Sequence, residues 1–334
     1  MEIYIDESGN FATRTDGSTF GVVGALVVTE SQFPILQQRY AQLRPLLPKD
    51  GSEVKGRELA ESDVARVVDV AYRSGLIYEA TPVYLEPADF SAIETHRARQ
   101  CEGLTRELTD QYHPGVVAAF HELRQRLERM PLQLYVQSIA TFDVLWKTMS
   151  HATAYHSQRE PEALGRFRWQ FDAKARDGIT DWEDWLSKLV KPMMQSRSID
   201  HPFVELQDGD YSHMAAKEIP VPEYLAKQFP RLNGKTGRDL SPAFNEMQFS
   251  AEMLPGLELV DVLTNAIRRA LMKRLDPAGW IGIRKLMIHR TGTSYIRPFG
   301  FGVEERIAPV EVAAVLRQFR TCGRSMLTEK LSRD

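Results

Sequence analysis

The sequence opens with the stretch that decides its fold, MEIYIDESGN at residues 1–10. Ile3 and Ile5 fall at alternate positions, which is the period of a strand with one face in a core. The acids Asp6 and Glu7 follow at once, and the next three residues, Ser-Gly-Asn, are typical of a turn. We therefore expect a first strand that ends at Asp6 and carries acidic side chains at its carboxyl end.

Two further strands are predicted in the N-terminal quarter, at residues 19–29 (TFGVVGALVVT) and 76–85 (LIYEATPVYL). The first of them is almost wholly apolar and rich in valine, as expected of a central strand buried on both faces. It follows the opening strand too closely for a helical crossover, so these two strands should be antiparallel. Helices are predicted at 31–43 and 61–74, and because they precede the strand at 76–85, its direction stays open.

The rest of the chain is predicted to alternate helices with short strands. Residues 88–155 look mostly helical and are expected to form a helical insertion, although LQLYV at 132–136 also fits a short strand. Residues 208–245 hold several prolines and glycines without a clean period, which is typical of a long loop or lid. The remaining predictions are strands at 166–171, 203–206 and 286–289, helices at 182–194 and 257–275, and a last helix after Pro309.

This order of elements predicts the fold class. We expect one α/β domain over residues 1–334, with a mixed sheet that begins antiparallel, gains parallel strands later and is flanked by helices. The composition agrees, because 43% hydrophobic and 26% charged residues are ordinary values for a globular chain.

Cysteine usage and hydropathy limit the class of protein further. Cys101 and Cys322 are the two cysteines, far apart and without a CxxC companion. That pattern excludes a cysteine zinc site and a disulfide framework, and it favours a reducing compartment. The chain opens without a signal-peptide pattern, and no apolar run approaches the roughly 18 residues of a membrane span. We therefore expect a cytoplasmic protein with no membrane segment.

The formal net charge of −3 means that any surface for nucleic acid must be local. Three basic clusters are available, and each also fits a solvated helix face. They are Arg268-Arg269 with Lys273-Arg274, Arg284-Lys285, and Arg124-Arg126-Arg129. The charge balance alone neither requires nor excludes a nucleic-acid substrate.

A second acid ends a second strand. RFRWQFDAK places Asp172 directly after the strand at 166–171, as Asp6 follows the first strand. Capping of a turn is the alternative role for each residue. If the two strands are parallel neighbours, their carboxyl ends meet at one sheet edge, and the like charges would raise a pKa. A divalent cation accepts both carboxylates as ionised ligands, and Mg²⁺ prefers such oxygen ligands.

A third acid lies near the start of the amphipathic helix at 257–275. Asp261 stands off the apolar stripe of this helix, and the helix dipole alone would favour an acid there. Glu252 and Glu258 are nearby alternatives.

Four segments together resemble the DUF3800 family, uncharacterised bacterial proteins that are grouped with the ribonuclease-H-like superfamily. They are YIDESG at 4–9, EVKG at 53–56, FDAK at 171–174 and FSAEMLPGLELVDVL at 249–263. The last segment is similar to a family stretch that ends in Gln-Leu-Ala-Asp, with Glu258 in place of Gln and Val260 in place of Ala. Family members tend to carry an upstream Asp-Ser pair, where this chain has Ala251 and Glu252.

The resemblance implies a ribonuclease-H-like fold and a carboxylate site for Mg²⁺ or Mn²⁺. Asp6 would bridge two metals, Asp172 and Asp261 would each hold one, and Glu7 would assist. Three further kinds of residue extend this site. Glu252 could stand in as a ligand, and Lys55 could contact a phosphate or an acid or be an ordinary solvated lysine. A glutamate from a helix could complete the site, and the sequence does not choose among Glu94, Glu102 and Glu107.

Other catalytic motifs are missing from the sequence. The eight histidines show no HExxH or HxH spacing, and there is no GxSxG elbow or GxxxxGKS loop. The run LNGKTG at 232–237 lacks the earlier glycine that a phosphate loop needs, so it fits a turn with a basic tip.

The resulting functional hypothesis is a metal-dependent nuclease that acts on DNA or RNA. Its contact surface is predicted on Arg268 and Arg269, with Lys273, because Arg268 lies nearly two helical turns after Asp261 on the same face. One alternative is an inactive, ribonuclease-H-like binding subunit of a defence or mobile-element system. Another is an actin- or hexokinase-like phosphotransferase, which the absence of any Gly-Gly pair disfavours.

Overall fold

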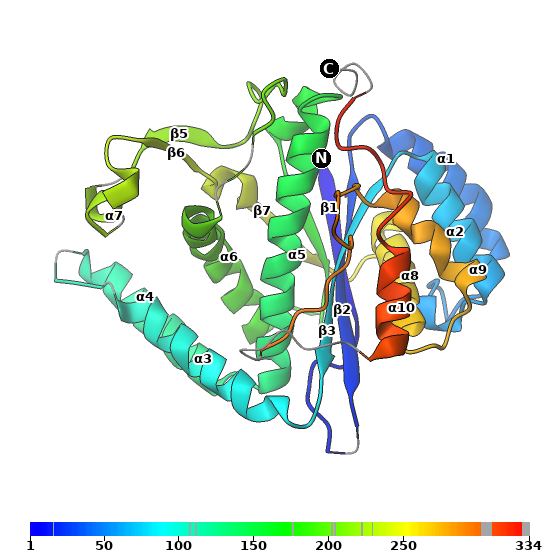
Figure 1. The fold of residues 1–334 in the computed structure, drawn as a ribbon, viewed down its shortest axis with the longest axis horizontal. Coiled ribbons are helices and arrows are strands. Elements are labelled where there is room, and N and C mark those ends of the chain that lie inside the picture. The colour runs from blue at the N-terminus through cyan, green and yellow to red at the C-terminus, as the bar shows by residue number, and fades with distance from the viewer. Residues whose placement is uncertain are drawn as a thin grey trace.

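A computed structural model of the chain describes residues 1–15, 17–106, 108–110, 112–175, 177–201, 203, 205–221, 223–228, 230–301 and 309–328. At its centre lies one five-stranded sheet in the order β3-β2-β1-β4-β7 (Figure 1). Its strands are β1 (Glu2–Gly9), β2 (Thr19–Val28), β3 (Ile77–Leu85), β4 (Arg168–Asp172) and β7 (Glu246–Ser250). The predicted α/β class with a mixed sheet flanked by helices is confirmed.

The directions of the strands divide the sheet into two parts. β1 pairs antiparallel with β2, and β2 pairs antiparallel with β3, which settles the direction that the sequence left open. β4 joins the other edge of β1 in parallel, and β7 continues in parallel beyond β4. Every residue of β2 is buried, as its apolar run predicts for a central strand.

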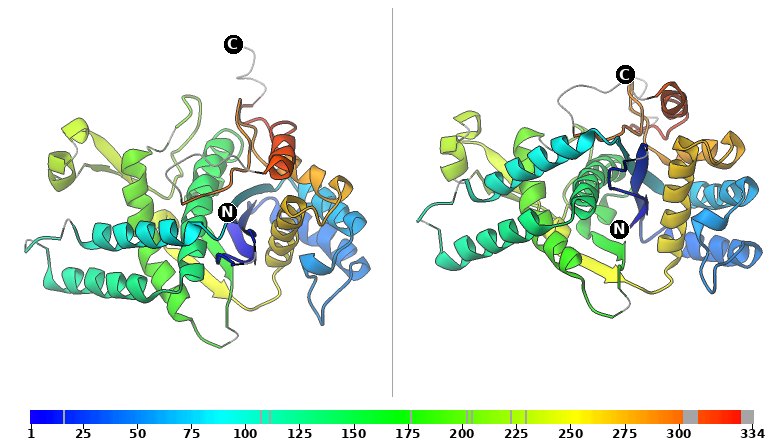
Figure 2. Two further views of the ribbon diagram at one scale, coloured as in Figure 1. Left: turned by 60° about the horizontal axis from the view of Figure 1, so that its bottom comes forward. Right: turned by 90° about the horizontal axis from the view of Figure 1, so that it is seen from below.

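Helices cover both faces of the sheet (Figures 1 and 2). Two long helices pack on one face, and several helices pack on the other. The first layer has α5 (Leu132–His156) and α6 (Asp181–Asp200); the second has α1 (Phe33–Leu43), α2 (Glu61–Arg73), α8 (Pro255–Leu271), α9 (Pro277–Trp280) and α10 (Val310–Gln318). Short 3₁₀ helices lie at Arg44–Leu46, Gly56–Glu58, Pro161–Gly165, Pro230–Leu232, Ser241–Phe244 and Ile281–Leu286.

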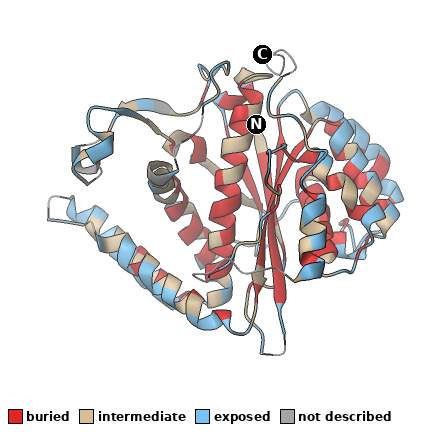
Figure 3. Ribbon diagram, in the orientation of Figure 1, coloured by how far each residue is buried: buried red, intermediate tan, exposed pale blue. Residues whose placement is uncertain are grey.

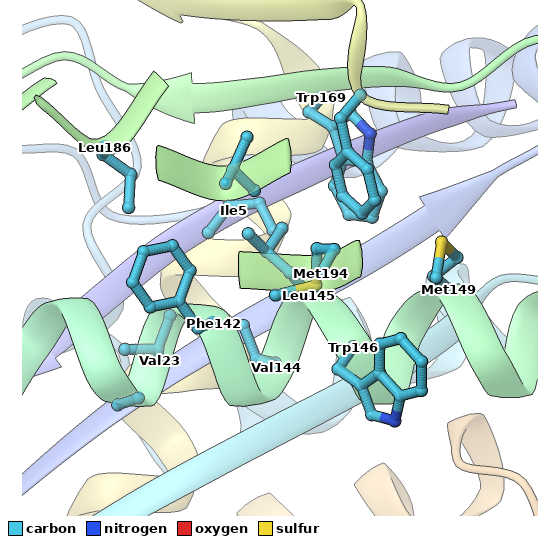
Figure 4. Close-up of a cluster of buried hydrophobic side chains, with 14 of the residues drawn as sticks. Ile5, Val23, Phe142, Val144, Leu145, Trp146, Met149, Trp169, Leu186 and Met194 are labelled. Carbon is cyan, nitrogen blue, oxygen red and sulfur yellow. The ribbon is translucent and has the colours of Figure 1, made fainter. Parts of the chain in front are cut away.

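Alternation along the strands creates two separate cores (Figure 3). On β1, Ile3 and Ile5 face the α5 and α6 layer, where they join Trp169 of β4 (Figure 4). Tyr4 faces the other way and packs in the α8 layer, together with Val22 of β2. The direction of every other side chain on β1, including the acids, follows from this alternation.

The range 88–155, expected as a single helical insertion, divides into two parts. α3 (Asp89–Arg106) and α4 (Pro114–Arg129) pack on each other and extend beside the sheet (Figure 1). α5 packs directly on β2 and β3, so it belongs to the core. The segment LQLYV is the first part of α5 and not a strand. α5 is buried around much of its circumference, which removes the period that identifies an amphipathic helix.

β1 continues past the point where the sequence predicted its end. Pairing with β2 runs on through Ser8 opposite Val22, so the expected turn after Asp6 is wrong. The strand ends at Gly9, which has a φ of +101°, a conformation that favours glycine. The turn residues of the sequence therefore mark an end of the strand at Gly9 and not at Asp6. Glu7 is therefore an ordinary strand residue.

The range 208–245, expected as a loop or lid, contains short elements. β5 (Lys217–Pro220) and β6 (Thr236–Asp239) form a separate two-stranded sheet, with α7 (Glu223–Gln228) between them. β7 was not predicted, because a short edge strand with exposed residues shows no hydrophobic run.

Three smaller predictions have different outcomes. The strand predicted at 286–289 is reduced to one bridge, between Ile288 and Arg324, whereas the helix predicted after Pro309 is confirmed as α10. The strand predicted at 203–206 includes Val204, which lies outside the described residues. In the described part of the chain no helix has the length and apolarity needed to cross a membrane.

Candidate acidic site

The three predicted aspartates lie together at the carboxyl end of the central strands. Ile5 of β1 is paired with Phe171 of β4, so Asp6 and Asp172 occupy the next positions of two parallel neighbours. By strand alternation both side chains face α8, and α8 supplies Asp261. All three line one small pocket of about 30 Å³, close to the volume of a single water molecule.

Two glycines allow α8 to lie close enough to the sheet to place Asp261 there. Gly24 of β2 is paired with Asp6, and a Cβ on Gly24 would clash with the Thr264 hydroxyl of α8. Gly256, in the first turn of α8, lies against the ring of Tyr4, where a Cβ would clash as well. The close approach of helix and sheet therefore depends on residues that have no side chain.

The carboxyl groups destabilise one another's charged forms. Burial raises the pKa of Asp6 well above its ordinary value, and the charges of Asp261 and Asp172 raise it further. Burial also raises the pKa of Asp172 and of Asp261. The side chains of Asp6 and Asp261 also influence each other's ionisation. The pocket thus holds more negative charge than its surroundings compensate.

Two lysines affect the ionisation of Asp6, and one of them, Lys55, lines the pocket. Lys55 lies 2.5 Å from Glu53, and although burial opposes its charged form, Glu53 and the aspartates raise its pKa. Lys174 forms an ion pair with Glu7, and burial lowers its pKa. Lys55 was predicted as a site residue and lines the pocket. Lys174 was missed, although it belongs to the segment FDAK that carried the resemblance.

The loop that brings Lys55 to the pocket is fixed by a buried acid. Glu258 accepts hydrogen bonds from Tyr40 Oη at 2.9 Å, from Arg44 Nε at 2.7 Å and from the Val54 backbone at 3.0 Å. Burial opposes ionisation of Glu258, but these donors outweigh it and lower its pKa. Next in the same loop, the Gly56 N–H donates to Asp261 Oδ2 at 2.8 Å. Glu258 therefore holds the loop in place and is not available as a ligand.

The other predicted acids differ in their position. Glu252 lines the pocket from its exposed rim. Glu7 faces the opposite side of the sheet from Asp6, because β1 continues as a strand, and there it pairs with Lys174. Glu94 pairs with Arg97 in α3, and neither it nor the exposed Glu102 lines the pocket. Glu107 lies outside the described residues.

A further buried acid, Glu183, was missed. It stands at the third position of α6, where Thr180 and Glu183 form a capping box. Its Oε1 accepts the backbone N–H of Lys174 at 2.8 Å, and its charge contributes, after burial, to the raised pKa of Asp172. The Thr-x-x-Glu spacing in the sequence signals the capping box, but the nearness to Asp172 depends on tertiary packing.

The arginines predicted as a substrate surface have structural partners. Arg268 Nε donates to the backbone oxygen of Phe20 at 3.3 Å, and Arg269 Nη1 donates to those of Gly56 and Leu59 at 3.2 and 2.7 Å. Neither arginine lines the acidic pocket. Their expected contact with a nucleic acid stays a prediction, whereas Arg268 binds the backbone of β2 and Arg269 binds that of the loop at Gly56 and Leu59.

The side chains of the pocket have the chemistry that a divalent cation requires, but they are not yet arranged around one point as its ligands. Three carboxylates with raised pKa values are the hard oxygen donors that Mg²⁺ and Mn²⁺ prefer, and a cation would compensate their charge. However, within the residues that the structure describes, no three His, Cys, Asp or Glu side chains are already arranged around one point as metal ligands. These carboxyls must be ionised to act as ligands, so metal binding competes with their protonation.

Comparison of the chain with protein-family models, curated proteins and solved structures gave no match.

Proposed function

We propose that this protein is a divalent-metal-dependent nuclease that hydrolyses phosphodiester bonds of DNA or RNA at the acidic pocket. The observation that carries the proposal is the shared pocket of Asp6, Asp172 and Asp261, whose pKa values are raised by burial although Lys55 lines the same pocket. A structural role does not explain this cluster of three buried carboxyl groups, because their proximity lowers the free energy of unfolding. A bound ligand of opposite charge would remove that cost.

The fold supports a ribonuclease-H-like assignment and membership of the DUF3800 family. The sheet begins with three antiparallel strands and continues with two parallel ones, as expected for that fold. The pocket lies where ligands usually bind in α/β sheets, beyond the carboxyl ends of parallel strands. The segments YIDESG, EVKG, FDAK and LELVD, on which the resemblance rests, each contribute a pocket residue or its direct neighbour.

In this proposal Asp6, Asp172 and Asp261 would hold Mg²⁺ or Mn²⁺, with Glu252 at the rim. When bound, such a cation polarises phosphate oxygens and lowers the pKa of water. The Gly56 N–H fixes the orientation of Asp261, and Glu258 fixes the loop that carries Gly56.

Lys55 is placed to contact the substrate. Its ammonium group lies in the pocket lining, and the surrounding acids keep it charged by raising its pKa against the effect of burial. A phosphate that enters between the aspartates and Lys55 would meet positive charge on its outer side. Lys55 would therefore orient the phosphate for attack.

The test is cleavage of a panel of single- and double-stranded DNA and RNA. We expect cleavage with Mg²⁺ or Mn²⁺, none with excess EDTA, and a rate that falls as salt rises, because phosphate contacts weaken with ionic strength. Asp172→Asn should reduce cleavage to background while the far-ultraviolet circular dichroism stays unchanged. The matched control is Asp110→Asn, at an exposed position outside the pocket, which should cleave normally. Cleavage that persists in EDTA, or that Asp172→Asn leaves intact, would contradict the proposal.

One observation favours the second candidate, a binding subunit without catalysis. Among the described residues, no three His, Cys, Asp or Glu side chains are already arranged as metal ligands. A protein that binds nucleic acid yet cleaves no member of the panel with either metal would support this alternative.

A further inference from the structure

A second, larger concavity continues from the acidic pocket along the same face of the sheet. It measures about 610 Å³ and lies over β4 and β7, and Glu252 belongs to the lining of both the pocket and this groove. The groove is open because α8 packs mainly on β1 and β2 and leaves the outer strands uncovered. We call this concavity the β4–β7 groove.

The floor of the β4–β7 groove carries a pair of amides. Gln170 of β4 and Gln248 of β7 are paired in the parallel register, and Gln170 Nε2 donates to Gln248 Oε1 at 3.0 Å. This bond occupies one donor and one acceptor. The Gln248 amide nitrogen and the Gln170 oxygen have no hydrogen-bond partner among the described residues, and both glutamines line the groove. Whichever glutamine donates, the pair keeps one amide nitrogen and one amide oxygen that are not used in this bond.

The rest of the lining consists of apolar and acidic residues together with the hydroxyl-bearing Tyr4 and Ser250. Phe33 and Leu254 are half-buried on its walls, and Glu2 and Glu252 also line it. Among the described residues that line the groove there is no lysine or arginine. A phosphate would therefore meet only negative charge here, whereas a flat, uncharged, hydrogen-bonding group meets apolar walls and a donor–acceptor pair.

We propose that the β4–β7 groove receives the base of the nucleotide beside the scissile phosphate, so that the substrate is single-stranded nucleic acid. This inference rests on the proposed nuclease function of the adjoining pocket. The amide pair matches the adjacent donor and acceptor that base edges display, as glutamine does toward adenine. The apolar walls offer contact to the base faces.

The position of the groove agrees with this assignment. Gln170 and Asp172 are two residues apart on β4, a separation of about 6.6 Å along a strand, and both face α8. A phosphate at the aspartates therefore places its own or the neighbouring base over the amide pair. In a duplex the base edges are paired and stacked, so only an unstacked strand can insert a base into such a groove.

The test is a thermodynamic cycle on binding, measured by fluorescence anisotropy in Ca²⁺. The probes are a labelled single-stranded oligonucleotide, its fully abasic counterpart and the corresponding duplex. Gln248→Met keeps the length of the side chain and removes its hydrogen-bonding groups. The matched control is Gln125→Met, at an exposed position on α4 outside the groove.

We expect Gln248→Met to weaken binding of the base-containing strand about tenfold and to leave the abasic strand unaffected, because one bidentate base contact is lost. Gln125→Met should bind like the wild type, and the duplex should bind more weakly than the single strand. Equal binding of wild type and Gln248→Met, an equal loss on both strands, or a preference for duplex would each overturn the groove assignment. The proposed function is read separately, by metal-dependent cleavage and its loss in Asp172→Asn, so the two can fail independently.

Discussion

At the scale of single residues, Asp6 has the most unfavourable environment in the described chain of any acid that the sequence singled out. It is 7% exposed, adjoins two other carboxylates and accepts a hydrogen bond from the Glu7 N–H at 2.7 Å. A residue kept in such a position is typical of a site in which stability is given up for function.

This environment predicts how Asp6→Asn changes stability without metal. Because the pKa of Asp6 is raised in the folded state, folding binds its proton more tightly than the unfolded chain does. The associated stability is therefore present at low pH and is lost as pH rises through the raised pKa. Asparagine keeps the acceptor for the Glu7 N–H and removes the charge. We expect Asp6→Asn to raise the free energy of unfolding by about 1 kcal/mol near pH 8.

The measurement is a series of thermal melts in EDTA between about pH 8 and pH 5. The gain from Asp6→Asn should shrink as the pH falls, because the wild-type carboxyl then takes up its proton. The exposed Asp110→Asn serves as the control and should show no gain. A variant that melts below the wild type at pH 8 would refute the claim that Asp6 is strained by its neighbours.

The sequence identified those site residues whose role can be inferred from the pattern of neighbouring residues. Asp6 and Asp172 were found because each directly follows a strand, and Asp261 because it lies off an apolar stripe. Glu7 was assigned to the same site because the turn residues after it suggested that the strand had ended. Glu183 was missed because a capping box looks the same at any helix, whatever lies beside it.

At the scale of elements, the sequence predicts a helix or strand where its hydrophobic residues follow a clear pattern, and it fails where they do not. α8 and β2 were found because one has a clear apolar stripe and the other an unbroken apolar run. α5 was only partly recognised, since burial on many sides leaves it without a polar face. β7 was missed because an exposed edge strand needs no apolar face.

The loop between α1 and α2 is held in place by Arg269, and this contact can be tested by mutation. Arg269 of α8 donates to the backbone oxygens of Gly56 and Leu59, and the same loop orients Asp261 through the Gly56 N–H. We expect Arg269→Ala to lower the free energy of unfolding by about 1.5–3 kcal/mol, because two backbone oxygens lose a charged donor. It should also weaken metal binding, since Asp261 loses its fixed orientation.

Urea unfolding and the salt dependence of nucleic-acid binding provide the readouts. If Arg269 acts only on the loop, the slope of log affinity against log salt stays as in the wild type. The contact surface predicted from the sequence requires instead that the magnitude of this slope falls by about one for each lost phosphate contact. The exposed Arg39→Ala on α1 is the control, and it should alter neither quantity.

At the scale of the whole molecule, the pocket is a consequence of strand order. β1 lies in the middle of the sheet, between β2 and β4, so its carboxyl end meets both the parallel part of the sheet and α8. Periodicity cannot give this order, because the register between β1 and β4 joins residues more than 160 positions apart, such as Ile5 and Phe171. The mixed sheet was predictable from the lengths of the connections, and the convergence of the acids only from the resemblance.

The most direct test of the account is a calorimetric titration with Mn²⁺ near pH 7.5, in two buffers of different ionisation enthalpy. We expect saturable binding to the wild type that releases protons, because carboxyls with raised pKa values must lose their protons before they can act as ligands. Asp6→Asn should abolish this binding, and the exposed Asp110→Asn should retain it. Absence of saturable binding to the wild type, or equal binding by Asp6→Asn, would contradict the claim that these carboxylates form a divalent-metal site.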